Sequence, residues 1–216
     1  MAYSDIGDFA PDDVLTAADM DQIRENFQAG VPDIFTTKGD LAGATGANAA
    51  ARLAVGANDA TLVPDSGEAT GMIWQTQPAA RVYNSGNIDP AVGSWVTLTF
   101  DSERIDTDTV HNPAVNPSRL TVPTGGAGLY LIGGNVAFEV GTGDKGIRIL
   151  LGGATVIAQS FGNATSDDGD VLSVTTLYSL AATNYVELQV FVEADLNILA
   201  SANYSPEFWA IWQRRA

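Results

Sequence analysis

The segment from residue 36 to residue 75 constrains this chain most, because turn residues punctuate it and little in it could form a core. Ten of its forty residues are alanine, and only eight are large and apolar: Leu41, Leu53, Val55, Leu62, Val63, Met72, Ile73 and Trp74. Fixing the backbone of one residue costs roughly 1 to 2 kcal/mol, whereas burial contributes about 25 cal/mol per Å² of apolar surface. We therefore expect the segment to become ordered only by packing against copies of itself.

Glycine-containing turns recur every few residues in this segment, so only short extended pieces fit between them. A single copy of such a segment would be disordered. Three intertwined copies could instead pack their few apolar side chains about a threefold axis, with Leu53 and Trp74 among them. The sequence thus predicts an extended, trimeric neck over residues 36–78.

The composition limits the classes of function. The 216 residues are 45% apolar and 17% charged, enough for one core of ordinary size plus an appendage. The absence of cysteine excludes disulfides, thiolate metal sites and a thiol nucleophile. A formal net charge of −16 repels phosphate backbones, so we expect no nucleic-acid partner, although an acidic surface can also serve solubility alone. The apolar runs are too short to span a bilayer, so we expect no membrane insertion.

Residues 1–35 are expected to form an anchor that contains a helix over about residues 17–29. Thr16 is placed to cap this helix, and an acidic first turn suits the helix dipole. The apolar side chains of one face follow at spacings of three and four: Met20, Ile23 and Phe27. A helix this short is marginal in water by itself. Its apolar face should therefore pack on sister helices, on a partner protein, or on the globular domain of its own chain.

From residue 79 to the C-terminus the pattern changes to alternating strands without an intervening helix. Residues 95–100 and 185–193 alternate most clearly. Further strands are expected near residues 81–84, 119–122, 128–140, 146–151, 155–161, 171–180, 196–202 and 208–213. About ten short strands separated by turns predict a mainly β head: a ten-stranded antiparallel jelly-roll sandwich.

The last of these strands is apolar on both faces. Phe208, Ala210 and Trp212 share one face, while Trp209 and Ile211 share the other. One face should enter the core of the sandwich, and the other should contact a neighbouring subunit unless the strand is central and buried on both sides. We count Trp209 and Trp212, together with Tyr185, among the candidate subunit contacts.

No arrangement of residues favours catalysis. The single histidine, His111, lies in a loop-like sequence, and the usual hydrolase, metalloprotease and phosphate-binding motifs are absent. Acidic residues do cluster at Asp101, Glu103, Asp106 and Asp108, and again at Asp167, Asp168 and Asp170. A pair of carboxylates could hydrolyse a glycosidic bond and turn acids could bind calcium, but solvent-exposed loop acids are the simpler interpretation. We expect no enzyme activity, no cofactor and no metal.

The segment 36–75 also contains recognisable sequence motifs. Thr37-Lys38-Gly39-Asp40-Leu41 is followed by an ARLAVG stretch at residues 51–56 and by a DSGEATGMIW stretch at residues 65–74. This combination closely resembles a linker repeat of bacteriophage tail-fibre and virion-surface proteins. The resemblance implies that the chain belongs to a virion.

The head carries a second resemblance. Residues 116–123 (NPSRLTVP) and 128–138 (GLYLIGGNVAF) are similar to a strand pair of the globular heads of complement and tumour-necrosis-factor-like proteins. The run NYVEL at residues 184–188 matches the start of a later strand of that family, with Asn184 where aspartate is usual. The resemblance covers residues 80–214 and implies an obligate trimer of ten-stranded jelly rolls.

Together these features predict a non-enzymatic homotrimeric structural protein of a tailed-phage virion. Its N-terminal region would bind the major capsid protein or the tail or baseplate, and its head would face outward as a capsid cement, decoration or head-fibre protein. A short tail fibre that contacts a host glycan or protein is the alternative, and a glycan depolymerase is a weaker one. The N-terminus shows no secretion signal, so we expect assembly in the host cytoplasm and residence on the virion surface.

Overall fold

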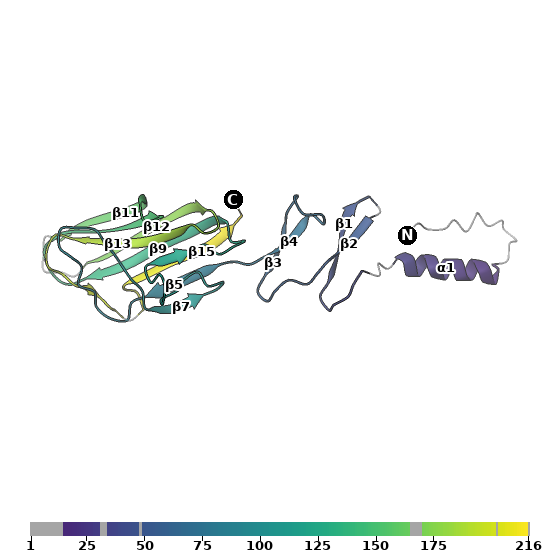
Figure 1. Cartoon of the computed structure of the whole chain (residues 1–216), viewed down its shortest axis with the longest axis horizontal. Helices are drawn as coiled ribbons and strands as arrows, with labels where there is room; N and C mark the ends of the chain where they lie inside the picture. Colours follow the sequence, from purple (N-terminus) through teal and green to yellow (C-terminus); the bar gives the residue numbers. More distant parts are fainter. Residues whose placement is uncertain (1–14, 31–33, 48, 165–169, 202, 216) are drawn as a thin grey trace. The chain divides into compact units, whose positions relative to one another are not determined.

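A computed structural model of the chain describes residues 15–30, 34–47, 49–164, 170–201 and 203–215, without the side chains of residues 26–30 and 164. The chain divides into two compact units, Met1–Gln75 and Thr76–Ala216. Figure 1 shows a helix and two small hairpins in the first unit and a set of long strands in the second. Each unit is described by itself below.

The first unit contains one described helix, α1 (Ala17–Gly30), and two hairpins. Strand β1 (Leu41–Gly46) pairs with β2 (Ala49–Leu53), and β3 (Thr61–Pro64) pairs with β4 (Met72–Gln75), both antiparallel. These strands are four to six residues long, as the close spacing of turn residues predicts. None of the described helices is long and apolar enough to cross a membrane.

Helix α1 begins at the cap that the sequence predicts. The backbone N–H of Asp19 donates to the Thr16 hydroxyl over 3.2 Å, and the N–H of Thr16 donates to the Asp19 carboxylate over 2.8 Å. This reciprocal pair satisfies two donors at the first turn. The hydrogen bond from the Thr16 hydroxyl lowers the pKa of Asp19.

The second unit is a sandwich of two antiparallel sheets (Figure 1). One sheet has the order β11-β10-β13-β6, with β8 also paired to β13, and the other has the order β12-β9-β15-β5-β7, with β14 also paired to β9. The strands of the first sheet are β6 (Val96–Thr97), β8 (Arg119–Thr121), β10 (Gly143–Leu151), β11 (Thr155–Ala164) and β13 (Tyr185–Val192). Those of the second sheet are β5 (Ala79–Tyr83), β7 (Ser102–Asp106), β9 (Gly128–Phe138), β12 (Val171–Leu180), β14 (Ile198–Leu199) and β15 (Glu207–Arg214). The predicted mainly β jelly-roll class is confirmed.

The core of the head lies between the two sheets. Every second residue of β13, from Val186 to Val192, is fully buried and faces the alternate residues of β9. Phe208 of β15 stacks on Phe100 with ring centroids 5.8 Å apart. The alternation read from the sequence therefore identifies the buried face of the long strands.

Two predicted strands are shorter than expected and one strand was missed. The run at residues 95–100 is a strand only at Val96–Thr97, and the run at 196–202 only at Ile198–Leu199. Strand β7, Ser102–Asp106, falls on residues that we expected to be loop acids. Because β7 is an edge strand that pairs only with β5, it needs few apolar side chains, and its sequence SERID gives little strand signal.

Candidate self-association site

The outer face of the β12-β9-β15-β5-β7 sheet is unusually apolar for a surface. In β15, Phe208, Ala210 and Trp212 enter the core, which leaves Trp209 and Ile211 on the outer face. Trp209 is half-buried, and Ile211 is 39% exposed. The sheet is therefore apolar on both sides at this strand.

Two rows of residues cross the outer face in register. The first row runs Leu177, Leu131, Ile211 and Ala79 over four neighbouring strands. The second runs Thr175, Gly133, Trp209, Arg81 and Ile105 over five. Leu177 and Ile105 are 58% and 53% exposed. A contiguous patch of this kind marks an interaction surface, and we call it the β15 face.

A hollow of about 390 Å³ opens on the β15 face. Trp209 and Ile211 of β15 form one side of it, and Ile105 of the edge strand β7 lies among the residues opposite. The remaining lining residues are Ala79, Ala80, Arg81 and Asn135. The hollow is large enough to receive an apolar side chain from another molecule.

Two arginines near the β15 face share one buried carboxylate of the same protomer. Glu207 is fully buried and pairs with both Arg81 and Arg104. Arg104 also lies over the ring of Tyr83, 4.2 Å from its centroid, and Arg81 donates to the carbonyl of Asn203 over 2.8 Å. The cationic groups beside the hollow are thus held in place, which leaves an apolar surface for a partner to cover.

The first unit presents a second apolar surface. None of the eight large apolar residues between residues 36 and 75 is buried: Leu41 and Val55 are 37% and 46% exposed, and the other six are half-buried. Trp74 lies against Gly56, where an added Cβ would come within 2.5 Å of the indole, and its ring N–H donates to the carbonyl of Ala54 over 2.7 Å. The hairpins thus have ordered hydrogen bonds but no core of their own.

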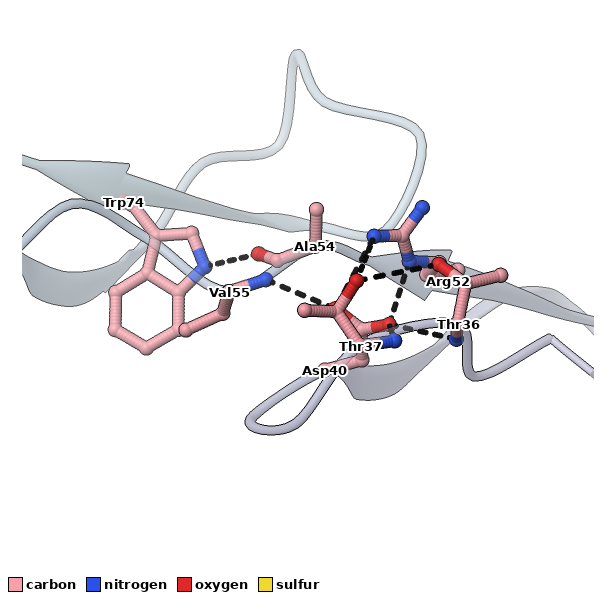
Figure 2. A network of polar contacts seen from close by, with 7 residues as sticks. All are labelled: Thr36, Thr37, Asp40, Arg52, Ala54, Val55 and Trp74. Carbon is pink, nitrogen blue, oxygen red and sulfur yellow. Dashed lines mark hydrogen bonds and ion pairs between the residues drawn. The ribbon is translucent and has the colours of Figure 1, made fainter.

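Asp40 organises the start of the hairpins (Figure 2). Its carboxylate accepts the backbone N–H groups of Thr36, Thr37 and Val55 over 2.9, 2.8 and 3.1 Å. It also accepts Nε of Arg52 over 2.7 Å. The Arg52 guanidinium and these backbone donors hold the pKa of Asp40 well below its ordinary value. One carboxylate therefore joins the two ends of the β1–β2 hairpin.

We expect Asp40→Asn to loosen this hairpin. The amide keeps one acceptor oxygen but loses the charge that holds Arg52, so the amides of Thr36, Thr37 and Val55 should exchange with deuterium roughly tenfold faster at neutral pH. Asp59→Asn removes the same charge at an exposed turn position and is the matched control. Equal exchange in both variants would contradict the role of Asp40.

The same carboxylate gives the hairpin a defined dependence on pH. Because the pKa of Asp40 is lower in the folded chain than its ordinary value of 3.8, its contribution to stability is complete above that value and is lost as pH falls below it. The amide resonances of Thr36, Thr37 and Val55 should therefore shift together only well below pH 3.8 in the parent protein, and not in Asp40→Asn.

The remaining predicted contact residues lie elsewhere. Met20 and Ile23 of α1 are 54% and 37% exposed, and the side chain of Phe27 lies outside the described residues. Tyr185 lies on the opposite sheet, with the Arg119 guanidinium 3.9 Å from its ring centroid. Trp212 is only 7% exposed and belongs to the core of its own head. The structure therefore keeps Trp209 on the β15 face but places Tyr185 and Trp212 away from it.

Sequence reasoning missed Ile105 and Leu177 of the β15 face. Leu177 could have been found, because it is a large apolar residue on the same face of β12 as the polar residues Ser173 and Thr175. Ile105 could not, because the strand that carries it was not recognised.

The acidic residues at positions 101–108 stabilise the following loop through polar contacts. Asp106 accepts the N–H of Val110 over 2.8 Å, and burial raises its pKa. Glu103 contacts Nδ1 of His111 over 2.9 Å, and Nε2 of His111 lies 3.2 Å from the carbonyl oxygen of Pro117. His111 is therefore buried in a structural role.

The other acidic cluster lies largely outside the described residues, which include neither Asp167 nor Asp168. Asp170 is described, and its carboxylate accepts Nζ of the buried Lys145 over 2.9 Å. Within the described part of the chain, no group of three or more His, Asp or Glu side chains could hold a metal ion.

Comparison with solved structures identifies the fold of the head. Murine APRIL at pH 5.0 is similar with a TM-score of 0.51 and 10% sequence identity, and murine APRIL at pH 8.5 with 0.50 and 8%; each comparison covers 64% of this chain and 100% of the other. The globular domain of zebrafish complement 1qA gives a TM-score of 0.47 at 15% identity, over 64% of this chain and 99% of the other. The head therefore has the jelly-roll fold of the tumour-necrosis-factor class. No protein-family model and no curated protein matches the sequence.

Proposed function

We propose that the chain is a non-enzymatic, homotrimeric structural protein of a tailed-phage virion. Three copies join through their necks and heads, the N-terminal region attaches the trimer to the particle, and the heads face outward. The trimer is a cement, decoration or head-fibre protein of the capsid surface. Threefold repetition of the head would convert weak contacts into avidity.

One observation carries the self-association in this proposal: both units leave apolar surface exposed in the single chain. On the head, Leu177, Ile105 and Ile211 are each at least 39% exposed on one sheet face. In the neck, all eight large apolar side chains are at least partly exposed. Copies of the chain can cover both surfaces at once. The resemblance of the head to trimeric jelly rolls supports three copies rather than two.

The virion role is supported by the linker repeat of residues 36–75, which resembles phage fibre and virion-surface linkers. A single repeat makes a short neck, which favours attachment close to a capsid over a long tail fibre. The acidic net charge of −16 suits a surface that faces away from packaged nucleic acid. A short tail fibre that contacts a host surface remains the second candidate.

Removal of residues 1–35 tests the attachment. We expect the truncated protein to form trimers of normal mass and to be absent from purified particles, because the anchor is lost and the self-association surfaces are kept. Immunoblotting of density-purified virions, with the full-length protein as the control, measures incorporation. Normal incorporation of the truncated protein would contradict the anchor.

The copy number in the same particles separates the two sites of attachment. Hundreds of copies per virion indicate decoration of the capsid, whereas a few to a few dozen indicate fibres.

Depolymerase activity is tested separately, by incubating purified trimer with capsular polysaccharide of the host and assaying reducing ends. We expect no new reducing ends. Release of new reducing ends would contradict a non-enzymatic role.

A further inference from the structure

The outer face of the other sheet, β11-β10-β13-β6, carries a cluster of three aromatic rings. The ring centroids of Trp95 and Phe161 lie 5.5 Å apart, those of Trp95 and Phe191 5.7 Å, and those of Phe161 and Phe191 6.4 Å. Phe161 is 55% exposed, although the other two rings are half-buried. The cluster lies on the sheet opposite the β15 face, so self-association through that face leaves it open. We call these three residues the aromatic platform.

The backbone holds the platform in place. Gly146 of β10 lies between Phe161 on β11 and Phe191 on β13 in the pairing register. A Cβ at Gly146 would meet Phe161 at 2.8 Å and Trp95 at 2.9 Å, so the rings lie directly on the glycine. The platform is therefore preformed, which reduces the entropic cost of binding a ligand.

A row of polar side chains lies beside the platform. In register across four strands it comprises Gln159, Arg148, Gln189 and Thr97. The Arg148 guanidinium lies 4.1 Å from the Trp95 ring centroid and donates from Nε to Gln189 over 2.8 Å, and Gln189 in turn donates to Thr97 over 2.8 Å. This chain of bonds fixes the plane of the guanidinium against the indole.

Arg148 has no acidic partner among the residues that the structure describes. Five other arginines in the described ranges each pair with a carboxylate: Arg24, Arg52, Arg81, Arg104 and Arg119. Every buried side-chain nitrogen and oxygen in the described part of the chain has a hydrogen-bond partner. The terminal nitrogens of Arg148 have no such partner there, so they are not fully buried. Burial of the rest of the side chain lowers the pKa of Arg148, a cost to the charged form that a bound anion would offset.

We infer that the aromatic platform and Arg148 bind an acidic saccharide. A sugar ring presents C–H bonds on its faces, which suit an aromatic ring, and oxygen atoms at its rim, which suit planar donors. A carboxylate on the sugar accepts two parallel N–H groups from the guanidinium, the strongest geometry that arginine offers. Gln159 is exposed at the same edge and can bond a neighbouring hydroxyl. An apolar surface with a few placed polar groups is typical of a small-ligand site.

The overall charge makes this inference easy to test. A chain with a net charge of −16 repels polyanions, so any preference for an acidic over a neutral polysaccharide requires a local site. The inference rests on the outward display of the head that we propose, but it is tested on purified protein. Its failure is therefore distinguishable from failure of the virion role.

The experiment measures binding of the full-length protein to polygalacturonate, to neutral dextran and to polyglutamate by biolayer interferometry. We expect polygalacturonate to bind roughly tenfold or more tightly than either of the others. Arg148→Gln and Phe161→Ala should each reduce that affinity by roughly tenfold or more. Arg214→Gln removes the same charge from an exposed position on β15 and should change it less than about twofold.

Phe161 is exposed, so its truncation opens no cavity in the core, and circular dichroism and sedimentation of each variant verify the fold. Three results would overturn the inference. The first is binding of dextran as tight as that of polygalacturonate. The second is equally tight binding of polyglutamate, which would indicate an acidic peptide as the ligand. The third is binding of polygalacturonate that neither Arg148→Gln nor Phe161→Ala reduces.

Discussion

Ile211→Asp is expected to convert the proposed trimer into monomers at micromolar concentration. Ile211 lies at the centre of the β15 face, between Leu131 and Ala79, and lines the hollow. A carboxylate there would lose its water on association, and Arg81 of the same hollow is already bound to Glu207 and to the carbonyl of Asn203. An unpaired buried charge costs about 3 to 5 kcal/mol, which raises a dissociation constant more than about hundredfold at each contact.

The matched control is Val115→Asp, which adds the same charge at a loop residue that is 69% exposed and outside the β15 face. Sedimentation velocity of both variants and of the parent, at equal protein concentration, distinguishes loss of assembly from loss of fold. Circular dichroism should show an unchanged strand content for Ile211→Asp, because the side chain is outside the core. Trimers of Ile211→Asp as stable as those of the control would show that the β15 face is not the contact surface.

Glu207→Ala is expected to destabilise the head by about 2 to 4 kcal/mol. The carboxylate is fully buried and is shared by two arginines that are themselves partly exposed. Removing the carboxylate takes the shared anion away from both arginines and leaves a cavity beside them. Because the arginines are partly exposed to solvent, the loss of unfolding free energy should be smaller than for a fully buried ion pair. Glu207→Gln retains the volume and one acceptor oxygen, so it should lose less.

The midpoint of urea unfolding at a fixed protein concentration measures this loss, since the stability of an oligomer depends on concentration. Asp195→Ala removes an exposed carboxylate that makes no side-chain bond within the described residues, and it should lie within about 0.5 kcal/mol of the parent. A loss of that small size for Glu207→Ala would contradict the structural importance of the shared carboxylate.

The head was predictable from its sequence where burial alternates. The run from Val186 to Val192 is buried at every second position, and the same period separates the two faces of β15. Alternation reports a strand that has one buried face. It fails for β7, whose sequence SERID is largely polar because the strand lies at the edge of its sheet.

The polar contacts could not be predicted, because they join residues that are distant in sequence. Glu207 meets Arg81 and Arg104 only after three strands align. His111 gives no sign in its sequence that Glu103 and Pro117 will enclose it. By contrast, the cap at Thr16 and Asp19 is local, and the spacing of three residues was enough to predict it.

The candidate site was predicted in part for the same reason. Alternation divided the last strand into one face with Phe208, Ala210 and Trp212 and another with Trp209 and Ile211, but it did not decide which face enters the core. Trp212 was therefore still counted among the subunit contacts, although the structure places it in the core. Alternation separates the two faces of a strand, and the packing of the whole sheet decides which of them is buried.

Sedimentation equilibrium of the purified full-length protein at micromolar concentration tests the central claim most directly. The proposed trimer would cover the exposed apolar residues of the neck and of the β15 face, so we expect one species with three times the monomer mass of 22.6 kDa. A well-folded species of 22.6 kDa that shows no association across this concentration range would contradict the account.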